Sequence, residues 1–190
     1  MEENIWKLFS KLWVKENIMD DKLKSNIIKS AKRIEENSLY AFKSHYNSAA
    51  IWSFIYHVLT IGIIIASSIT IAYTFSDTNP YIIRILAIIA LIFSSLVMFF
   101  NPSEKIRIHN EAGSSYSSLN SKAETFREIE AEYYEETYVK GKIFELRDKR
   151  DEFNSKYPQP LTLGYIAAKI GIWLGEAINK VDKSEKKQKV

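Results

Sequence analysis

The chain has 190 residues, with 26 Lys and Arg against 23 Asp and Glu, a net charge of +3 and no cysteine. The absence of cysteine excludes disulfides and thiolate chemistry, and the small net charge, with interleaved lysine and glutamate, does not indicate nucleic-acid binding. Charged residues make up 26% of the chain, yet the stretch Ile51–Phe100 contains only Asp77 and Arg84.

Residues 4–17 have the spacing of a short amphipathic helix, with an apolar, Trp-rich face opposite three lysines. Basic amphipathic helices that contain tryptophan lie well in a membrane interface. The same apolar face could instead dock on the protein's own cytoplasmic helices. The sequence leaves both interpretations open.

Residues 20–50 predict a second helix, because apolar and small residues recur every three or four positions. The predicted buried stripe consists of Leu23, Ile27, Ala31 or Ser30, Ile34, Ser38, Ala41 and Phe42. No glycine or proline occurs between Met1 and Gly62. This absence allows the helix to run continuously into the apolar stretch that follows.

Two apolar runs, Ile51–Phe75 and Tyr81–Phe100, are joined by the turn residues Ser76–Pro80. Each is long enough for a helix that crosses the roughly 30 Å core of a bilayer, which takes about 20 residues. The pattern therefore predicts a transmembrane helical hairpin. The alternative, a pair of core helices in a soluble domain, would require burial of this whole, nearly uncharged stretch inside one small chain.

The distribution of Lys and Arg predicts that both termini are cytoplasmic, because cytoplasmic segments carry an excess of these residues. Nine lie in residues 1–50 and sixteen in residues 101–190, whereas the connecting loop has only Arg84 near it. We expect no cleavable signal peptide, since the first apolar run begins at about residue 51.

Polar residues in the first predicted span follow a regular order. Hydroxyl residues recur every seven positions and therefore share one helix face: Ser53, Thr60, Ser67 and Thr74. His57 lies close to this face. We interpret these five residues as candidates for lining a pore. The alternative is that each hydroxyl bonds to a carbonyl of its own helix, as is common in lipid.

Small residues on both spans predict close helix packing. The candidates are Gly62 and Ala66 in the first span and Ala87, Ala90 and Ser94 in the second.

Asn101-Pro102-Ser103-Glu104 is typical of a helix start. A stripe at coiled-coil-like spacing follows it: Ile106, His109, Ala112, Gly113, Tyr116, Leu119, Ala123, Phe126, Ile129 and Tyr133. We expect this helix to pack against the helix of residues 23–42. We expect Gly141 to break it, a further helix to cover residues 143–157, and Pro158-Gln159-Pro160 to end that helix.

Residues 161–181 predict an amphipathic helix that contains Gly171 and Trp173. Lys169 and Glu176 argue against a third span, so we expect this helix to contact the membrane surface or a partner helix. The tail 183–189 is basic and polar, which is typical of a disordered segment that favours anionic lipid.

Catalytic and metal-binding constellations are missing from the sequence. The three histidines His45, His57 and His109 lie on different predicted elements, no HExxH motif occurs, and six glycines form no phosphate-binding loop. We therefore expect no enzyme, no cofactor and no metal. His109 lies on the apolar stripe just after the second span, where it is either a hydrogen-bonded core residue or a switch in the pairing of the cytoplasmic helices.

The helix leading into a two-span hairpin, followed by Asn101-Pro102, Arg107, His109, Tyr116 and Leu119, resembles the SLATT family over residues 20–155. These are two-transmembrane effector domains associated with SMODS nucleotidyltransferases and SLOG sensors in bacterial conflict systems. The resemblance implies a membrane effector that oligomerises into pores and kills or arrests the infected cell. It also implies control by a nucleotide second messenger, such as a cyclic nucleotide, or by a partner that makes or senses one.

The sequence thus predicts an all-α, multi-pass protein of the bacterial inner membrane. Its parts are N-terminal cytoplasmic helices (1–50), the hairpin (51–100), a cytoplasmic helical segment forming an antiparallel bundle or coiled coil (101–157), and an amphipathic helix with a basic tail (158–190). The predicted function is a homo-oligomeric pore-forming effector of antiphage defence. The alternatives are a non-conducting membrane scaffold that recruits partners and a small transporter subunit.

Overall fold

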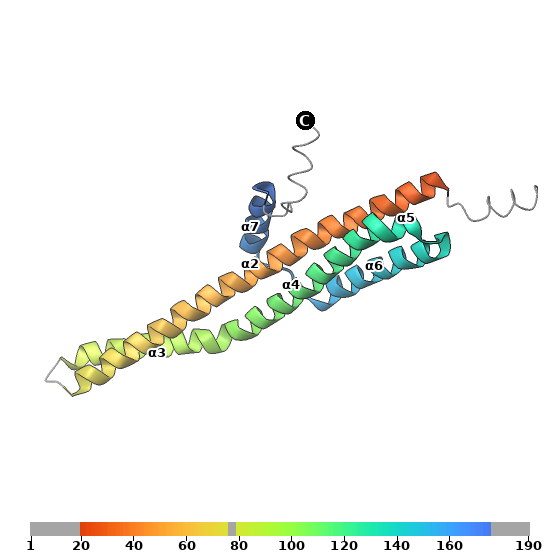
Figure 1. The fold of residues 1–190 in the computed structure, drawn as a ribbon. Helices are drawn as coiled ribbons and strands as arrows, with labels where there is room; N and C mark the ends of the chain where they lie inside the picture. The colour runs from red at the N-terminus through yellow and green to blue at the C-terminus, as the bar shows by residue number, and fades with distance from the viewer. Residues whose placement is uncertain (1–19, 76–78, 176–190) are drawn as a thin grey trace, which may run out of the picture. The chain divides into compact units, whose positions relative to one another are not determined.

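The computed structural model describes residues 20–75 and 79–175, and every regular element in those ranges is helical. The elements in chain order are α2 (Asp21–Thr74), α3 (Pro80–Phe100), α4 (Pro102–Thr125), the π-helical turn η1 (Phe126–Glu130), α5 (Ala131–Tyr133), α6 (Glu136–Lys156) and α7 (Thr162–Trp173) (Figure 1). The prediction of an all-α chain is confirmed for these ranges. The helix predicted for residues 4–17 and the tail 183–189 lie outside the described residues.

Helix α2 is continuous over 54 residues, as the lack of glycine and proline before Gly62 predicted. It begins after Asp20, whose Oδ1 accepts a hydrogen bond from the backbone N–H of Lys22 at 3.3 Å. A side chain that accepts from a free N–H of the first turn stabilises a helix start.

The boundaries of α3 also follow local chemistry. Asn79 Oδ1 accepts a hydrogen bond from Tyr81 N at 3.1 Å, and Pro80 occupies the first helical position, where its missing N–H costs nothing. At the other end Asn101 adopts a left-handed conformation with φ 43° and ψ 60°, and α4 begins at once with Pro102. Asparagine tolerates this conformation better than most residues, so Asn101-Pro102 is a sharp junction between two helices.

The chain divides into two compact units, each assembled from two separate segments. The first unit contains the described residues 20–42 and 112–158, and the second contains 43–75, 79–111 and 159–175.

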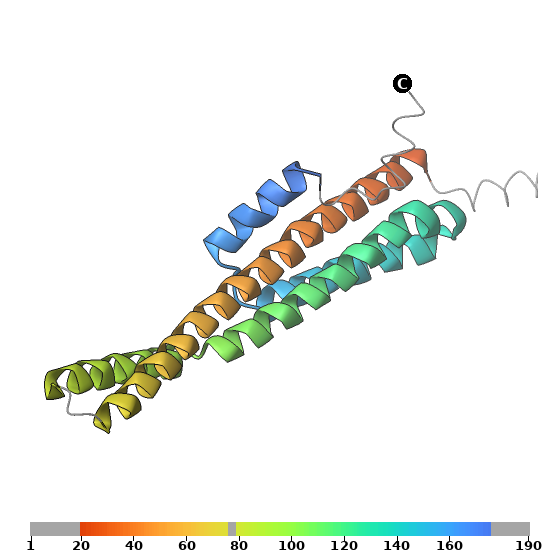
Figure 2. The same cartoon turned by 60° about the vertical axis from the view of Figure 1, so that its left-hand side comes forward.

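The first unit has an apolar core built by α2, α4 and α6, which run alongside one another in both Figure 1 and Figure 2. Its fully or almost fully buried residues are Ile27, Ala31, Ile34, Leu119, Ala123, Phe126, Ala131, Val139, Ile143 and Leu146. The predicted stripe of α2 is therefore confirmed, including Ser38, which is 1% exposed. At the edge of this core Arg127 donates to Glu35, with Nε 2.6 Å from Oε2.

The apolar stripe predicted from Ile106 to Tyr133 is buried or partly buried as far as Phe126, and the prediction is wrong beyond that residue. Ile129 is 54% exposed and Tyr133 is 80% exposed, whereas Ala131 is buried. The reason is η1, because a π-helical turn takes in an additional residue and rotates the following side chains away from their expected face. Gly141 does not break the helix either. The break falls at Tyr134 and Glu135, and Gly141 lies inside α6.

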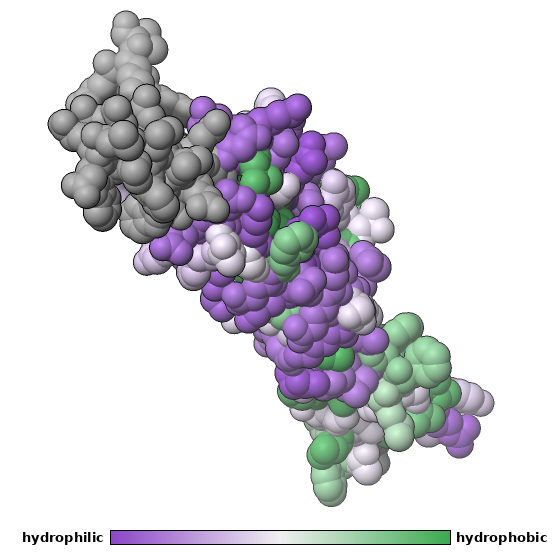
Figure 3. All heavy atoms as spheres, turned by 90° about the vertical axis from the view of Figure 1, so that its right-hand side faces the viewer, coloured by the Kyte–Doolittle hydropathy of each residue, from purple (hydrophilic) through white to green (hydrophobic). Residues whose placement is uncertain are grey.

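The second unit holds the apolar helices. Two helices are long and apolar enough to cross a membrane, one in Asp21–Thr74 and one in Pro80–Tyr133. Only 6% of the apolar window in the first is buried inside the structure, and none of that in the second. These helices are therefore not the buried core of the described chain. In the view of Figure 3, most hydrophobic residues are gathered in one part of the surface, and a few others lie among the hydrophilic residues.

Candidate functional site

A buried pair of histidines joins α2 to α4 within the second unit. The Nδ1 atoms of His45 and His109 are 2.9 Å apart, and each residue is 3% exposed. A hydrogen bond between two imidazole nitrogens needs one donor and one acceptor, so two neutral rings must adopt different tautomers. His45 and His109 lie on different helices, as predicted from the sequence, and their contact can be found only by aligning α2 antiparallel to α4.

The pKa values of both histidines of the pair lie below that of a free imidazole. Burial, together with the neighbouring His109, lowers the pKa of His45 to about 4. Burial and the positive charge of Lys105 lower the pKa of His109 as well. Protonation of both rings would place two donors against each other and remove the hydrogen bond, so we expect acid to weaken the contact between these helices.

His57 has a different environment from the pair. Its side chain is exposed, and its Nδ1 lies 2.6 Å from the carbonyl oxygen of Ser53 on the same helix.

The serine and threonine hydroxyls of the first predicted span differ in their partners. Ser53 Oγ lies 3.4 Å from Nδ1 of His57, one turn further along the helix. Thr70 Oγ1 donates to the carbonyl of Ala66 at 2.7 Å, and Thr74 Oγ1 donates to that of Thr70 at 2.8 Å. Thr60 and Ser67, by contrast, are half-buried, and the described part of the chain offers their hydroxyls no hydrogen-bond partner. The alternative of internal hydrogen bonding thus holds for Thr74 and not for Thr60 or Ser67.

Small residues let α2 approach α3 closely, as predicted for Gly62. A Cβ atom added to Gly62 would lie 2.6 Å from Cδ2 of Phe93 on α3, which is closer than real contacts allow. Ala66, one turn further on, is 4% exposed. On α3, Ala90 is half-buried, whereas Ser94 is exposed.

Helix α7 contacts α2 through small residues, a feature that the predicted amphipathic pattern did not include. Ser48 Oγ donates to the carbonyl of Ser44 at 2.7 Å and accepts from Leu161 N at 2.9 Å. Asn47 Nδ2 donates to the carbonyl of Gly164 at 3.3 Å. A Cβ on Gly164 would lie 2.8 Å from Ser44 O, so this contact requires glycine.

The large side chains of α7 point away from this contact and are exposed: Leu163, Ile166, Ile170 and Trp173. The prediction that a membrane surface or a partner helix covers these side chains stays a prediction.

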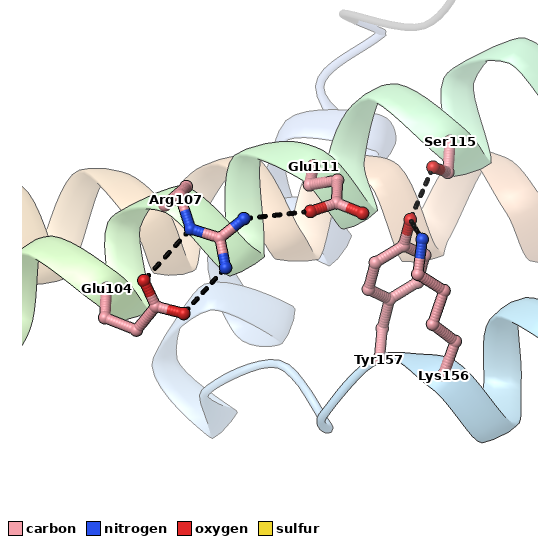
Figure 4. Close-up of polar contacts among 6 residues, drawn as sticks. All are labelled: Glu104, Arg107, Glu111, Ser115, Lys156 and Tyr157. Carbon is pink, nitrogen blue, oxygen red and sulfur yellow. Dashed lines mark hydrogen bonds and ion pairs between the residues drawn. The ribbon is translucent and has the colours of Figure 1, made fainter.

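The polar residues that follow the second predicted span lie on α4 (Figure 4). Pro102 is buried at the helix start, and Arg107 donates to Glu104 at 2.7 and 3.0 Å and to Glu111 at 3.3 Å. The hydrogen bonds from Arg107 lower the pKa of Glu104. All three side chains are largely exposed, and exposed ion pairs of this kind contribute little to stability.

Tyr116 and Leu119 belong to the interior of the first unit. Tyr116 is 5% exposed, and its hydroxyl donates to Asn154 Oδ1 on α6 at 2.8 Å. Tyr157, whose ring packs near that of Tyr116, shares a hydrogen bond with Ser115 at 2.8 Å and accepts one from Lys156 at 3.0 Å (Figure 4). These hydrogen bonds and ring contacts connect the C-terminal end of α6 to α4.

Over the described residues, no group of three or more His, Asp or Glu side chains is placed to hold a metal ion. Comparison with protein-family models, with curated proteins and with solved structures finds no match.

Proposed function

We propose that this chain is an effector of the bacterial inner membrane. In this proposal α2 and α3 form a transmembrane hairpin with both termini in the cytoplasm, and copies assemble so that the face carrying Thr60 and Ser67 borders water. The resulting pore dissipates the membrane potential and arrests the cell. The resemblance to SLATT domains supports a role in antiphage defence, controlled by a nucleotide second messenger or a partner protein.

The observation that carries the proposal is the pair of hydroxyls without partners, on helices whose apolar surface is exposed. Exposed apolar helices of this length are stable in lipid, because their backbone polar groups are satisfied internally. A hydroxyl without a partner is costly in that environment. Water or a second copy of the chain satisfies both Thr60 and Ser67, because residues seven apart lie on the same helix face.

The proposal is tested by measuring membrane potential with a voltage-sensitive dye in bacteria that express the full chain, alone and during phage infection. We expect depolarisation with the natural chain and none with T60V/S67A, which keeps side-chain volume and removes the two hydroxyls. The matched control is T70V/S95A, because Thr70 and Ser95 donate to carbonyls of their own helices.

Depolarisation by the natural chain and the control, but not by T60V/S67A, supports the pore. A stable potential under both conditions, with the chain in the membrane fraction, contradicts it and favours a scaffold that recruits partners. Equal depolarisation by all three chains would show that the hydroxyl face does not line the pore.

A further inference from the structure

The first unit contains a polar cavity between its three long helices. Its volume is about 250 Å³, and its lining consists of Asn37, Ser38 and Ala41 from α2, Tyr116 from α4, and Arg150 and Asn154 from α6. Pockets for drug-sized ligands have volumes of roughly 300–1,000 Å³. The size of this cavity therefore fits a small ligand with few heavy atoms.

Ser38 is the unusual residue of this lining. It is 1% exposed, and its hydroxyl has no hydrogen-bond partner in the part of the chain that the structure describes. Helical hydroxyls in this chain commonly donate to the carbonyl four residues earlier, as Ser48 and Thr125 do. Buried polar groups are nearly always satisfied in folded proteins. The hydroxyl of Ser38 therefore indicates a partner that comes from outside the chain.

The remaining polar groups of the cavity are chiefly donors. Asn154 Oδ1 accepts the hydrogen bond from the Tyr116 hydroxyl, which leaves the two N–H bonds of the same amide to donate. Arg150 has donors only. Its guanidinium binds Asp151 Oδ1 through Nε at 3.0 Å and Nη2 at 2.8 Å.

The pairing of Arg150 with Asp151 does not prevent it from binding a ligand. Asp151 is the next residue along the helix, and its side chain is 62% exposed. An ion pair with such an exposed partner contributes little to stability, so a ligand can replace it. A guanidinium with hydroxyl and amide donors beside it matches the geometry of carboxylate and phosphate groups.

We propose that this cavity binds a small oxyanion, a molecule with a phosphate or carboxylate group, held between Arg150 and the Ser38 hydroxyl with Asn154 as a further donor. Because α2, α4 and α6 all line the cavity, the ligand bridges the three helices of the unit. The binding does not depend on the membrane activity proposed above.

The test is a titration of the ¹⁵N-labelled full chain in detergent micelles, followed by NMR signals of the Asn154 side-chain amide and Arg150 Nε. Inorganic phosphate and acetate are the two probes, and chloride at equal ionic strength is the reference. We expect saturable shifts with at least one probe, at a dissociation constant of about 1 mM or below. The stronger probe distinguishes a phosphate from a carboxylate ligand.

Three variants make the test specific. S38A removes the hydroxyl and should weaken binding about tenfold, while the unfolding temperature does not fall, because that hydroxyl has no partner to lose. R150Q should abolish saturation. R147Q removes an equal charge from the same helix at an exposed position outside the cavity lining, and it should bind like the natural chain.

Absence of saturation with both probes up to about 20 mM would overturn the proposal. Unchanged binding in S38A and R150Q would overturn it as well, because the anion would then lie elsewhere. Since the readout is binding in micelles, a failure of this proposal leaves the membrane-potential result unaffected.

Discussion

Acidification should weaken the contact between α2 and α4 through His45 and His109. The pKa of His45 falls from 6.5 to about 4 on folding, so between these values the unfolded chain binds a proton that the folded chain does not. The stabilisation is complete above pH 6.5 and is lost as the pH falls toward 4. For this shift, going from pH 7 to pH 5 removes about 2 kcal/mol from the free energy of unfolding.

The assay is thermal unfolding of the full chain in detergent at pH 7 and pH 5. For a chain of this size, 2 kcal/mol corresponds to a decrease in unfolding temperature of about 4–8 °C. Other groups also titrate in this range, so the decisive comparison is with H45N/H109N. Asparagine can preserve a hydrogen bond there and does not titrate.

The double variant should show a smaller dependence on pH than the natural chain. H57N is the matched control, because His57 is exposed and hydrogen-bonded only to its own helix turn. An equal decrease in the natural chain and in H45N/H109N would refute the assignment of acid sensitivity to this pair.

Substitutions of Gly164 and Gly62 test the close helix contacts, and a substitution of Gly141, which has no such contact, serves as the comparison. Gly164→Ala should destabilise the contact of α7 with α2 by about 1–3 kcal/mol, because the new Cβ meets backbone atoms of Ser44 and Ser48 at 2.8 and 3.0 Å. Faster amide hydrogen exchange in α7 would show this loss of stability. Gly141→Ala is the comparison, because a Cβ at that position meets nothing within 4 Å. This substitution should stabilise α6 by about 0.5–1 kcal/mol. Gly62→Val should lower the unfolding temperature through its collision with Phe93, and adding Phe93→Ala should restore part of the loss. If the two changes are simply additive, α2 and α3 do not meet at these residues.

The elements that could be predicted from sequence are those fixed by local chemistry. The continuity of α2 follows from the absence of glycine and proline before Gly62, and its buried stripe follows from helical periodicity. The junction at Asn101-Pro102 follows from the conformational preferences of those two residues. Close packing at Gly62 also follows from residue size.

Other features depend on interactions that a one-dimensional pattern does not contain. The π-helical turn after Phe126 changes the phase of the stripe, and no glycine or proline marks it. The pairing of His45 with His109 requires the alignment of helices far apart in sequence. Ser38 fits the stripe as a small residue, whereas its hydroxyl without a partner is visible only once its neighbours are in place.

The central claim is that the face of the first span carrying Thr60 and Ser67 borders water in the membrane. The chain has no cysteine, so single cysteines can be introduced and reacted with a water-soluble thiol reagent in intact membranes. T60C and S67C should react rapidly, whereas V58C and I65C, at positions that are 49% and 53% exposed on the opposite face of the helix, should be protected by lipid. Equal protection of all four cysteines would contradict the account.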